Sequence, residues 1–229
     1  MALLPISAWP PAAGLSTVLV PRASTTFSVF ASATIHAPAC LIFNNLRNTT
    51  SYPEWNTFTP SAAIDLPHNL VNPDFLTTGD TFTFVVILDP AAPQNRTQSF
   101  EKVFDISTPQ FPSSYVPPAL LKDGSFYPNL KKVYRASWGD NNPATAGGLL
   151  VSERFSEVVE LGKKKSVYHT WENFGGPVAA SVQQNQSTLQ ARFEDYARDL
   201  KGYSERLFKE KKHCHPKKGG HANPKWCYT

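Results

Sequence analysis

Polar and aromatic residues that could do chemistry gather late in the chain, on three predicted strands at residues 130–138, 149–161 and 165–174. His169 is the only histidine in a predicted strand, and an imidazole can act as a general acid or base near neutral pH. Arg154 could hold a ligand carbonyl or carboxylate. Glu172 could form a carboxylate pair with Glu153. The candidates for catalysis are therefore His169, Arg154, Glu172 and Tyr134.

Each of these candidates also has a purely structural interpretation. A core histidine can simply be hydrogen-bonded, strand glutamates are commonly exposed, and an arginine can form a surface salt bridge. Alternation along a strand places His169 and Trp171 on one face and Glu172 on the other, while Tyr134 and Trp138 share a face of their own strand. The aromatic content favours an inward-facing set of Tyr134, Trp138, His169 and Trp171, although the sequence alone leaves either face open.

The signatures of several cofactor and catalytic classes do not occur in the sequence. It contains no GxGxxG, GxxxxGK[ST], GxSxG or HExxH, so nucleotide cofactors, serine-hydrolase chemistry and zincin chemistry have no support. The last residues match no zinc pattern and could bind a metal only adventitiously; the metal-capable ones are His213, Cys214, His215, His221 and Cys227. We therefore expect neither a cofactor nor a metal.

The composition predicts one folded domain with a basic end. Of 229 residues, 41% are hydrophobic and 12% aromatic, enough for a sizeable core. The formal net charge is +4, but residues 209–229 contain six lysines and one glutamate, so residues 1–208 carry −1. The basic balance therefore predicts no nucleic-acid partner. Three scattered cysteines make no disulfide framework, and Cys40, in an apolar run, is predicted to be a small core residue.

The sequence indicates a soluble, cytoplasmic protein. Its first residues are apolar, but they lack a basic leading region and are interrupted by prolines, which fits neither a signal peptide nor a spanning helix. No run of about 18 apolar residues occurs anywhere. Three glycosylation sequons begin at Asn48, Asn95 and Asn185, and without a secretion signal we interpret them as chance. We expect no membrane insertion, and a monomer or a homodimer.

The earlier part of the chain alternates between proline-rich segments and predicted strands. Residues 1–23 hold four prolines and no hydrophobic period, which predicts an extended amino-terminal arm. Pro38 suits the first turn of a short helix within residues 36–48. The proline density of residues 108–129 predicts a long loop, a candidate rim or lid. Strand-like composition predicts further strands at residues 26–35, 61–66, 81–88 and 98–107.

A long helix is predicted after the last strand. No proline occurs between Pro177 and residue 212, and one apolar stripe recurs at spacings of four and three residues; it comprises Leu189, Phe193, Tyr196, Leu200, Tyr203 and Leu207. The strands are consecutive without intervening helices, so the sheet should be antiparallel. Residues 24–212 are thus predicted to be a single domain, and residues 213–229 a flexible basic tail.

The order of these elements and three local segments resemble the SRPBCC superfamily, also called START-like or Bet v 1-like. The segments are Tyr-Pro-Glu-Trp-Asn at 52–56, Leu-Leu-Val-Ser-Glu-Arg-Phe at 149–155, and Thr-Trp-Glu at 170–172 followed by Gly-Gly-Pro at 175–177. The spacing is similar to that of fungal members described as polyketide cyclase or dehydrase-like. The resemblance implies the α+β helix-grip fold, in which a curved antiparallel sheet of six to seven strands surrounds a long C-terminal α-helix and two short helices close one end.

The resemblance also implies an apolar cavity between the sheet and the long helix, suited to a hydrophobic small molecule. Candidate substrate-binding residues around it are Trp55, Phe58, Phe84, Trp138, Trp171, Phe193 and Tyr196. Trp55 could be a wall of this cavity or only a core plug. The implied function is a cofactor-independent cyclase, pericyclase or dehydratase in secondary (polyketide or terpenoid) metabolism. The alternative is a non-catalytic carrier or sensor of lipid-like ligands, because fold alone does not decide between them.

Overall fold

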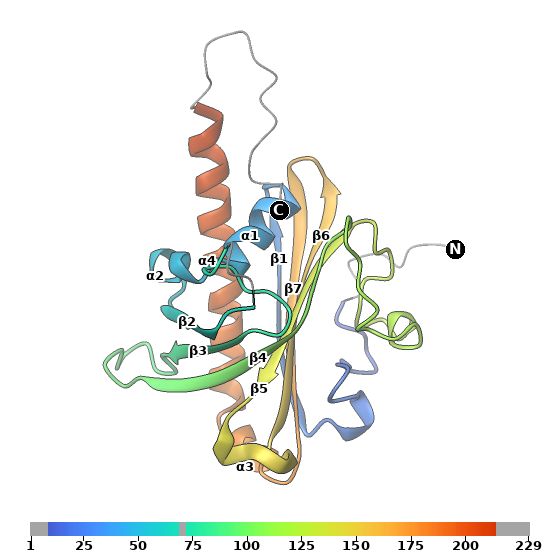
Figure 1. Ribbon diagram of the computed structural model, residues 1–229, viewed down its shortest axis with the longest axis vertical. Helices are drawn as coiled ribbons and strands as arrows, with labels where there is room; N and C mark the ends of the chain where they lie inside the picture. Colours follow the sequence, from blue (N-terminus) through green and yellow to red (C-terminus); the bar gives the residue numbers. More distant parts are fainter. Residues whose placement is uncertain (1–8, 69–71, 214–229) are drawn as a thin grey trace.

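Seven antiparallel strands form one sheet in the order β1-β7-β6-β5-β4-β3-β2, which confirms the predicted sheet (Figure 1). The structure is a computed structural model that describes residues 9–68 and 72–213, without the side chains of 211–213. The predicted basic tail beyond residue 213 lies outside the described residues. The strands are β1 (Phe27–Ile35), β2 (Ser61–Leu66), β3 (Thr81–Val86), β4 (Thr97–Ser107), β5 (Val133–Asp140), β6 (Val151–Gly162) and β7 (Lys165–Gly175).

The long helix α4 (Gln186–His213) packs along one face of the sheet, which we call the inner face. The predicted apolar stripe faces this sheet: Phe193 and Leu200 are at most 1% exposed, and Tyr196 is fully buried. A short helix, α3 (Ala179–Gln183), precedes α4, so the predicted helical stretch is interrupted between Gln183 and Gln186. Together the sheet and helix make the helix-grip fold that was predicted.

Two short helices close one end of the sheet, α1 (Ala39–Arg47) and α2 (Tyr52–Trp55). A proline in the first turn of α2 suits the start of a helix. The indole of Trp55 meets the ring of Tyr196 edge to face at 5.1 Å, and its Nε1 donates to Ser51 Oγ at 3.3 Å. Trp55 therefore packs between α2 and α4, which explains a large aromatic residue in so short a segment.

The opposite face of the sheet, which we call the outer face, is covered by two proline-rich segments. Residues 9–23 of the amino-terminal arm and the loop at residues 108–129 lie on the side of the sheet away from α4 (Figure 1). They bury a second apolar cluster that comprises Leu15, Val116, Phe126, Phe155 and Trp171. The sheet is therefore a middle layer with aromatic side chains buried on both faces.

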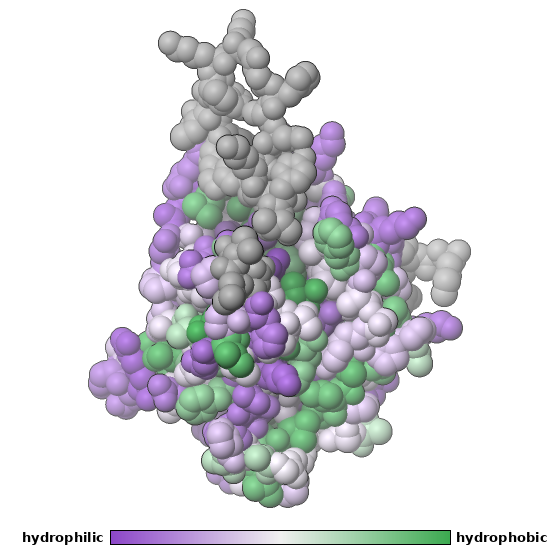
Figure 2. Space-filling model, in the orientation of Figure 1, coloured by the Kyte–Doolittle hydropathy of each residue, from purple (hydrophilic) through white to green (hydrophobic). Residues whose placement is uncertain are grey.

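Two further features concern single residues. Cys40 was predicted to be a core residue, but it is only partly buried and it is disulfide-bonded; the other two cysteines, Cys214 and Cys227, lie outside the described residues. On the face shown in Figure 2, hydrophobic and hydrophilic residues are interspersed, with a band of hydrophobic residues across its lower part. Phe111, in the proline-rich loop, is the most exposed large hydrophobic residue of the described chain, at 76%.

Candidate functional site

Strand register assembles the candidate site as one row across the inner face. Trp138 of β5 lies opposite Arg154 of β6, and Arg154 lies opposite Glu172 of β7. Side chains of directly opposed residues point to the same face of a sheet, so all three point toward α4. Trp138 is packed in the inner core, which fixes the direction of the row.

Arg154 is a buried cation among aromatic rings. Only 3% of it is exposed, and its guanidinium lies 4.2 Å from the ring centroid of Tyr196 and 4.3 Å from that of Phe193. Its Nε donates to Thr170 Oγ1 at 3.1 Å. Its Nη2 is buried with no hydrogen-bond partner. The rings hold the cation in place by cation–π attraction while one donor stays free.

A second buried ionisable side chain, Glu101 of β4, completes the cluster. Its Oε1 accepts a hydrogen bond from Ser99 at 2.5 Å, whereas its Oε2 is buried with no partner. Burial, reinforced by the nearby charge of Glu172, raises the pKa of Glu101 to about 8. Arg154 opposes this shift. A carboxyl with such a pKa is mostly protonated at neutral pH and can donate a proton.

Glu172 is the more accessible carboxyl of the two. It is partly buried, whereas Glu101 is 8% exposed. Burial raises the pKa of Glu172 to about 6, against the attraction of Arg154 and a hydrogen bond from Ser152. At neutral pH it is therefore mostly ionised and can accept a proton. Two interacting carboxyls with separated pKa values can supply an acid and a base within one site.

Two tyrosines, Tyr52 and Tyr196, lie next to Arg154 and are joined through their hydroxyl groups. The hydroxyls of Tyr52 and Tyr196 are 3.2 Å apart, and Tyr52 donates to the carbonyl of Leu46 at 2.8 Å. Tyr196 therefore donates to Tyr52. Burial raises the pKa of both tyrosines, so they stay protonated and can orient polar ligand atoms but do not act as bases near pH 7.

A pocket of about 470 Å³ adjoins the carboxylate end of the cluster. It is lined by the end of β5 and the start of β6, including Asp140 and Ser152. Asp140 lies opposite Glu101 in the β4–β5 ladder, and Ser152 hydrogen-bonds Glu172. The pocket is therefore lined by a neighbour of each carboxyl, Asp140 for Glu101 and Ser152 for Glu172.

Most of the sequence-predicted site residues belong to the inner core. Trp55, Phe58, Phe84, Trp138, Phe193 and Tyr196 are all buried there. Tyr134 also faces inward, but it lies four residues from Trp138 along β5 and packs against Phe43, with ring centroids 5.4 Å apart. Tyr134 therefore stands apart from the cluster around Arg154.

The prediction that His169 and Trp171 face the interior is wrong. His169 stacks on Trp9 of the arm at 4.1 Å, and the Nε1 of Trp171 donates to the carbonyl of Ser16 at 3.0 Å. Both therefore lie on the outer face, and they cannot border one cavity together with Trp138. The reason is that the arm and the long loop bury aromatic side chains on that face as well. Burial lowers the pKa of His169 to about 4, so it is neutral at physiological pH.

The predicted carboxylate pair of Glu153 and Glu172 is also wrong in one of its two members. Glu153 lies on the outer face, where it accepts hydrogen bonds from Leu19 N and Tyr115 Oη, each at 2.7 Å. The carboxyl that interacts with Glu172 is Glu101, which was not among the predicted site residues. The pairing of Glu101 with Phe82 in the β3–β4 hairpin is the signal that places it inward, because Phe82 is fully buried.

The described residues contain no group of three or more histidine, cysteine, aspartate or glutamate side chains placed to hold a metal ion. Within the same residues, no helix is long and apolar enough to cross a membrane. The chemistry of the cluster is thus that of two carboxyls, a guanidinium and aromatic rings.

Comparison with known proteins supports the fold but no closer identity. Neither a family model nor a curated protein matches the chain. A hypothetical protein from Helicobacter pylori is 14% identical, with a TM-score of 0.55 over 89% of this chain and 96% of that one. The Zhui aromatase/cyclase from Streptomyces sp. R1128 is 10% identical, with a TM-score of 0.50 over 79% and 94%. A protein from Thermus thermophilus is 11% identical, with a TM-score of 0.50 over 79% and 99%. At these identities the likeness shows a shared fold alone.

Proposed function

We propose that this chain is a cofactor-free enzyme that transfers protons on a hydrophobic small molecule carrying a carbonyl group, as a cyclase or dehydratase. The observation that carries the proposal is a pair of buried ionisable side chains, each with one polar atom that has no hydrogen-bond partner: Nη2 of Arg154 and Oε2 of Glu101. Buried polar atoms without partners cost about 1–3 kcal/mol each, and more when charged. A fold gains nothing from two of them, whereas a bound oxygen function would satisfy both.

The pKa values of the two carboxyls define their roles in the proposed reaction. Glu172, ionised at neutral pH, takes a proton from the carbon next to the substrate carbonyl, and the C–H electron pair becomes an enolate. The guanidinium of Arg154 stabilises the developing negative charge on the enolate oxygen. The enolate carbon then attacks a second carbonyl, or its electrons expel a β-hydroxyl group.

Glu101 completes the proton balance of the proposed reaction. It is protonated at neutral pH, and it delivers its proton to the oxygen that is formed by the attack or that leaves. Glu172 ends protonated and Glu101 ionised, and proton exchange with water restores the starting state. The step consumes no oxidant, reductant or co-reactant.

The aromatic rings around Arg154 set the substrate class. Phe193, Tyr196 and Trp138 surround its guanidinium, the last at 5.5 Å from the ring centroid. Rings of this kind select flat, hydrophobic molecules and can hold a reactive conformer. One protein of the same fold carries the name aromatase/cyclase, which agrees with this class. We therefore favour a polyketide-like or terpenoid-like substrate of secondary metabolism.

A carrier of lipid-like ligands is the second candidate function. It is favoured by the enclosure of Arg154 by its own rings, since a buried guanidinium can also hold a ligand carboxylate without turnover. Both functions predict binding in the inner core, and only the enzyme predicts proton transfer.

Proton abstraction can be measured directly with phenylacetone as the probe. The full chain is incubated with phenylacetone in D₂O, and deuterium entry next to the carbonyl is followed by NMR. We expect exchange above the buffer rate, with a loss of about 10²-fold in Glu172→Gln and a similar loss in Arg154→Met. Phenylacetate, which has a carboxylate in place of the ketone, serves as the matched ligand. Binding of phenylacetate without any exchange of phenylacetone would establish the carrier and refute the enzyme.

A further inference from the structure

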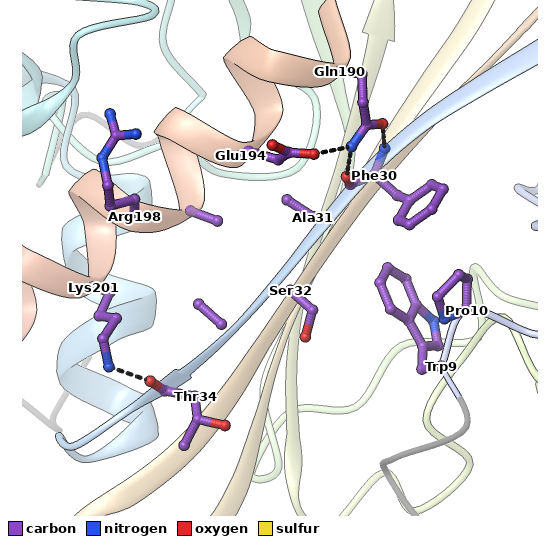
Figure 3. Close-up of a pocket in the computed structure, with 12 residues that line it drawn as sticks. Trp9, Pro10, Phe30, Ala31, Ser32, Thr34, Gln190, Glu194, Arg198 and Lys201 are labelled. Atoms are coloured by element: carbon purple, nitrogen blue, oxygen red, sulfur yellow. Dashed lines mark hydrogen bonds between the residues drawn. The ribbon is translucent and has the colours of Figure 1, made fainter. Parts of the chain in front are cut away.

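A groove of about 610 Å³ lies at the open edge of the sheet, apart from the proposed active site. It runs between β1, which is an edge strand, and α4, and the amino-terminal arm forms its far wall (Figure 3). It is hollow because Ala31, Ala33 and Ala197, which line it, are small. A volume of this size suits a small molecule.

Side chains of α4 cover several of the outward-facing backbone groups of β1. Gln190 accepts from Phe30 N at 3.0 Å through Oε1 and donates to Phe30 O at 2.8 Å through Nε2. Lys201 donates to Thr34 O at 2.6 Å. One carboxamide thus satisfies both backbone groups of one residue on this edge, and the two bonds of Gln190 are drawn in Figure 3.

Ser32 lies between these two covered residues and is left open. In an antiparallel pair, alternate residues direct their N–H and C=O groups away from the partner strand. Phe30 and Thr34 do so, and Ser32 therefore does so as well. In Figure 3 no hydrogen bond reaches Ser32 from any of the residues drawn. An open donor and acceptor on one residue thus face the groove.

The indole of Trp9 supplies a firm aromatic wall next to Ser32. Its Nε1 donates to Ser125 O at 3.0 Å, its ring stacks on His169 at 4.1 Å, and it meets Phe30 edge to face at 5.9 Å. A tryptophan held by three contacts offers a flat apolar surface at low entropic cost.

From this arrangement we infer that the groove is a second ligand site, which binds a neutral primary carboxamide or lactam joined to a flat ring. The ligand carbonyl accepts from Ser32 N–H, and the ligand N–H donates to the Ser32 carbonyl, as Gln190 does on Phe30. The ring packs against Trp9. This site does not depend on the proposed enzymatic function.

The surrounding charges favour a neutral ligand over an anion. The two cations that line the groove, Arg198 and Lys201, already have partners: Arg198 pairs with Asp195 and Lys201 with Glu205. The remaining charge on the wall is the carboxylate of Glu194. An extended peptide is disfavoured as well, because Gln190 and Lys201 block the backbone positions on either side of Ser32.

Benzamide is the probe, titrated into the ¹⁵N-labelled full chain and followed by NMR. We expect shifts at Ser32, Ala33, Ala197 and the indole N–H of Trp9. Methyl benzoate has the same ring and carbonyl but no N–H, and it should bind about 5-fold more weakly, since one hydrogen bond is lost. Equal binding of the two probes, or benzamide shifts confined to other residues, would overturn the inference.

Ser32→Pro removes the outward N–H without removing a bond of the β1–β7 ladder, which an edge strand tolerates. Benzamide affinity should fall about 5-fold, because one hydrogen bond is lost. Ser28→Pro is the matched control, because Ser28 also points its backbone outward, toward Gln186, but does not line the groove. Its affinity should equal that of the wild type. Should Ser32→Pro fail to fold, Trp9→Ala decides: unchanged benzamide affinity in that variant refutes the site.

Discussion

Glu172 lies opposite Arg154 in the β6–β7 ladder, so a carboxylate and a guanidinium share the inner face of the sheet beneath α4. The attraction of Arg154 opposes the effect of burial on the pKa of Glu172. Removing either partner must therefore change the proton affinity of the other, and the change can be read from the pH dependence of stability.

Replacing Arg154 with methionine should destabilise the protein more at pH 8 than at pH 5. Without the cation, Glu172 and Glu101 are no longer attracted to Arg154, and the pKa values of both carboxyls rise further above their values in the unfolded chain. Each carboxyl then binds its proton more tightly in the folded than in the unfolded state. The free energy of unfolding therefore falls as the pH rises above the pKa of the unfolded chain. Each unit by which a carboxyl pKa rises costs about 1.4 kcal/mol of stability above that pKa, and we expect a loss of that order or more at pH 8. Urea unfolding at both pH values measures it.

The double variant Arg154→Met, Glu172→Gln is the control for this prediction. It removes both charges, so much of the loss at pH 8 should be recovered. An equal loss for Arg154→Met at pH 5 and pH 8 would mean that the arginine acts only through packing against its rings.

Glu101→Gln should stabilise the protein at high pH. The pKa of Glu101 is raised from an ordinary value of 4.5 to about 8, so wild-type stability is present in full below about pH 4.5 and is lost as pH rises toward 8. The carboxamide of glutamine does not ionise in this pH range, so the variant avoids the cost of burying a carboxylate. We expect a gain of about 1–3 kcal/mol at pH 8 and almost none at pH 5. Ser99→Ala is a useful comparison, since it removes the hydrogen bond to Oε1 but keeps the carboxyl.

The sequence predicted the architecture well because hydrophobic period and proline content are local signals. The stripe of α4, the antiparallel strands and the loop at residues 108–129 all follow from them. The faces of the late strands could not be assigned in the same way. His169 and Trp171 were placed inward by their aromatic content, but the arm buries them on the outer face, and contacts between residues over 100 positions apart leave no local pattern.

Glu101 shows the same limit for a catalytic candidate. It is a charged residue in a strand whose hydrophobic neighbours, Phe100 and Phe104, are less buried than it is. A bulge between Val103 and Asp105 shifts the register of β4 against β5, so simple alternation over the whole strand gives the wrong face. Arg154 and Glu172 were predicted as site residues. Their acid–base partner, Glu101, could be identified only from the pairing of β4 with its neighbouring strands.

His169→Ala should leave phenylacetone exchange unchanged, because His169 is on the outer face and contacts Trp9, not Arg154. The variant should instead lose stability, by about 1–3 kcal/mol, since it removes a buried ring stacked on the arm. Deuterium exchange and urea unfolding on the same samples separate the two effects. A fall in exchange of about 10²-fold at unchanged stability would return His169 to the reaction.

Asn173→Ala should loosen the amino-terminal arm from the outer face. The Nδ2 of Asn173 donates to the carbonyls of Leu15 and Val20, each at 2.9 Å, and Asn173 is fully buried. Loss of this side chain leaves the carbonyl of Leu15 without its donor, whereas the carbonyl of Val20 still accepts from Thr17, and we expect a cost of about 1–3 kcal/mol. Trypsin should then cleave after Arg22 faster than in the wild type, because cleavage requires the arm to leave the sheet.

Asn45→Ala is the matched control for the arm. Asn45 is also a buried asparagine, and its Nδ2 donates to Ser204 Oγ at 3.0 Å between α1 and α4, on the other side of the sheet. It should lower the free energy of unfolding without faster cleavage at Arg22 under native conditions. Equal acceleration in both variants would show that cleavage follows global unfolding, and that the arm and the sheet open as one unit.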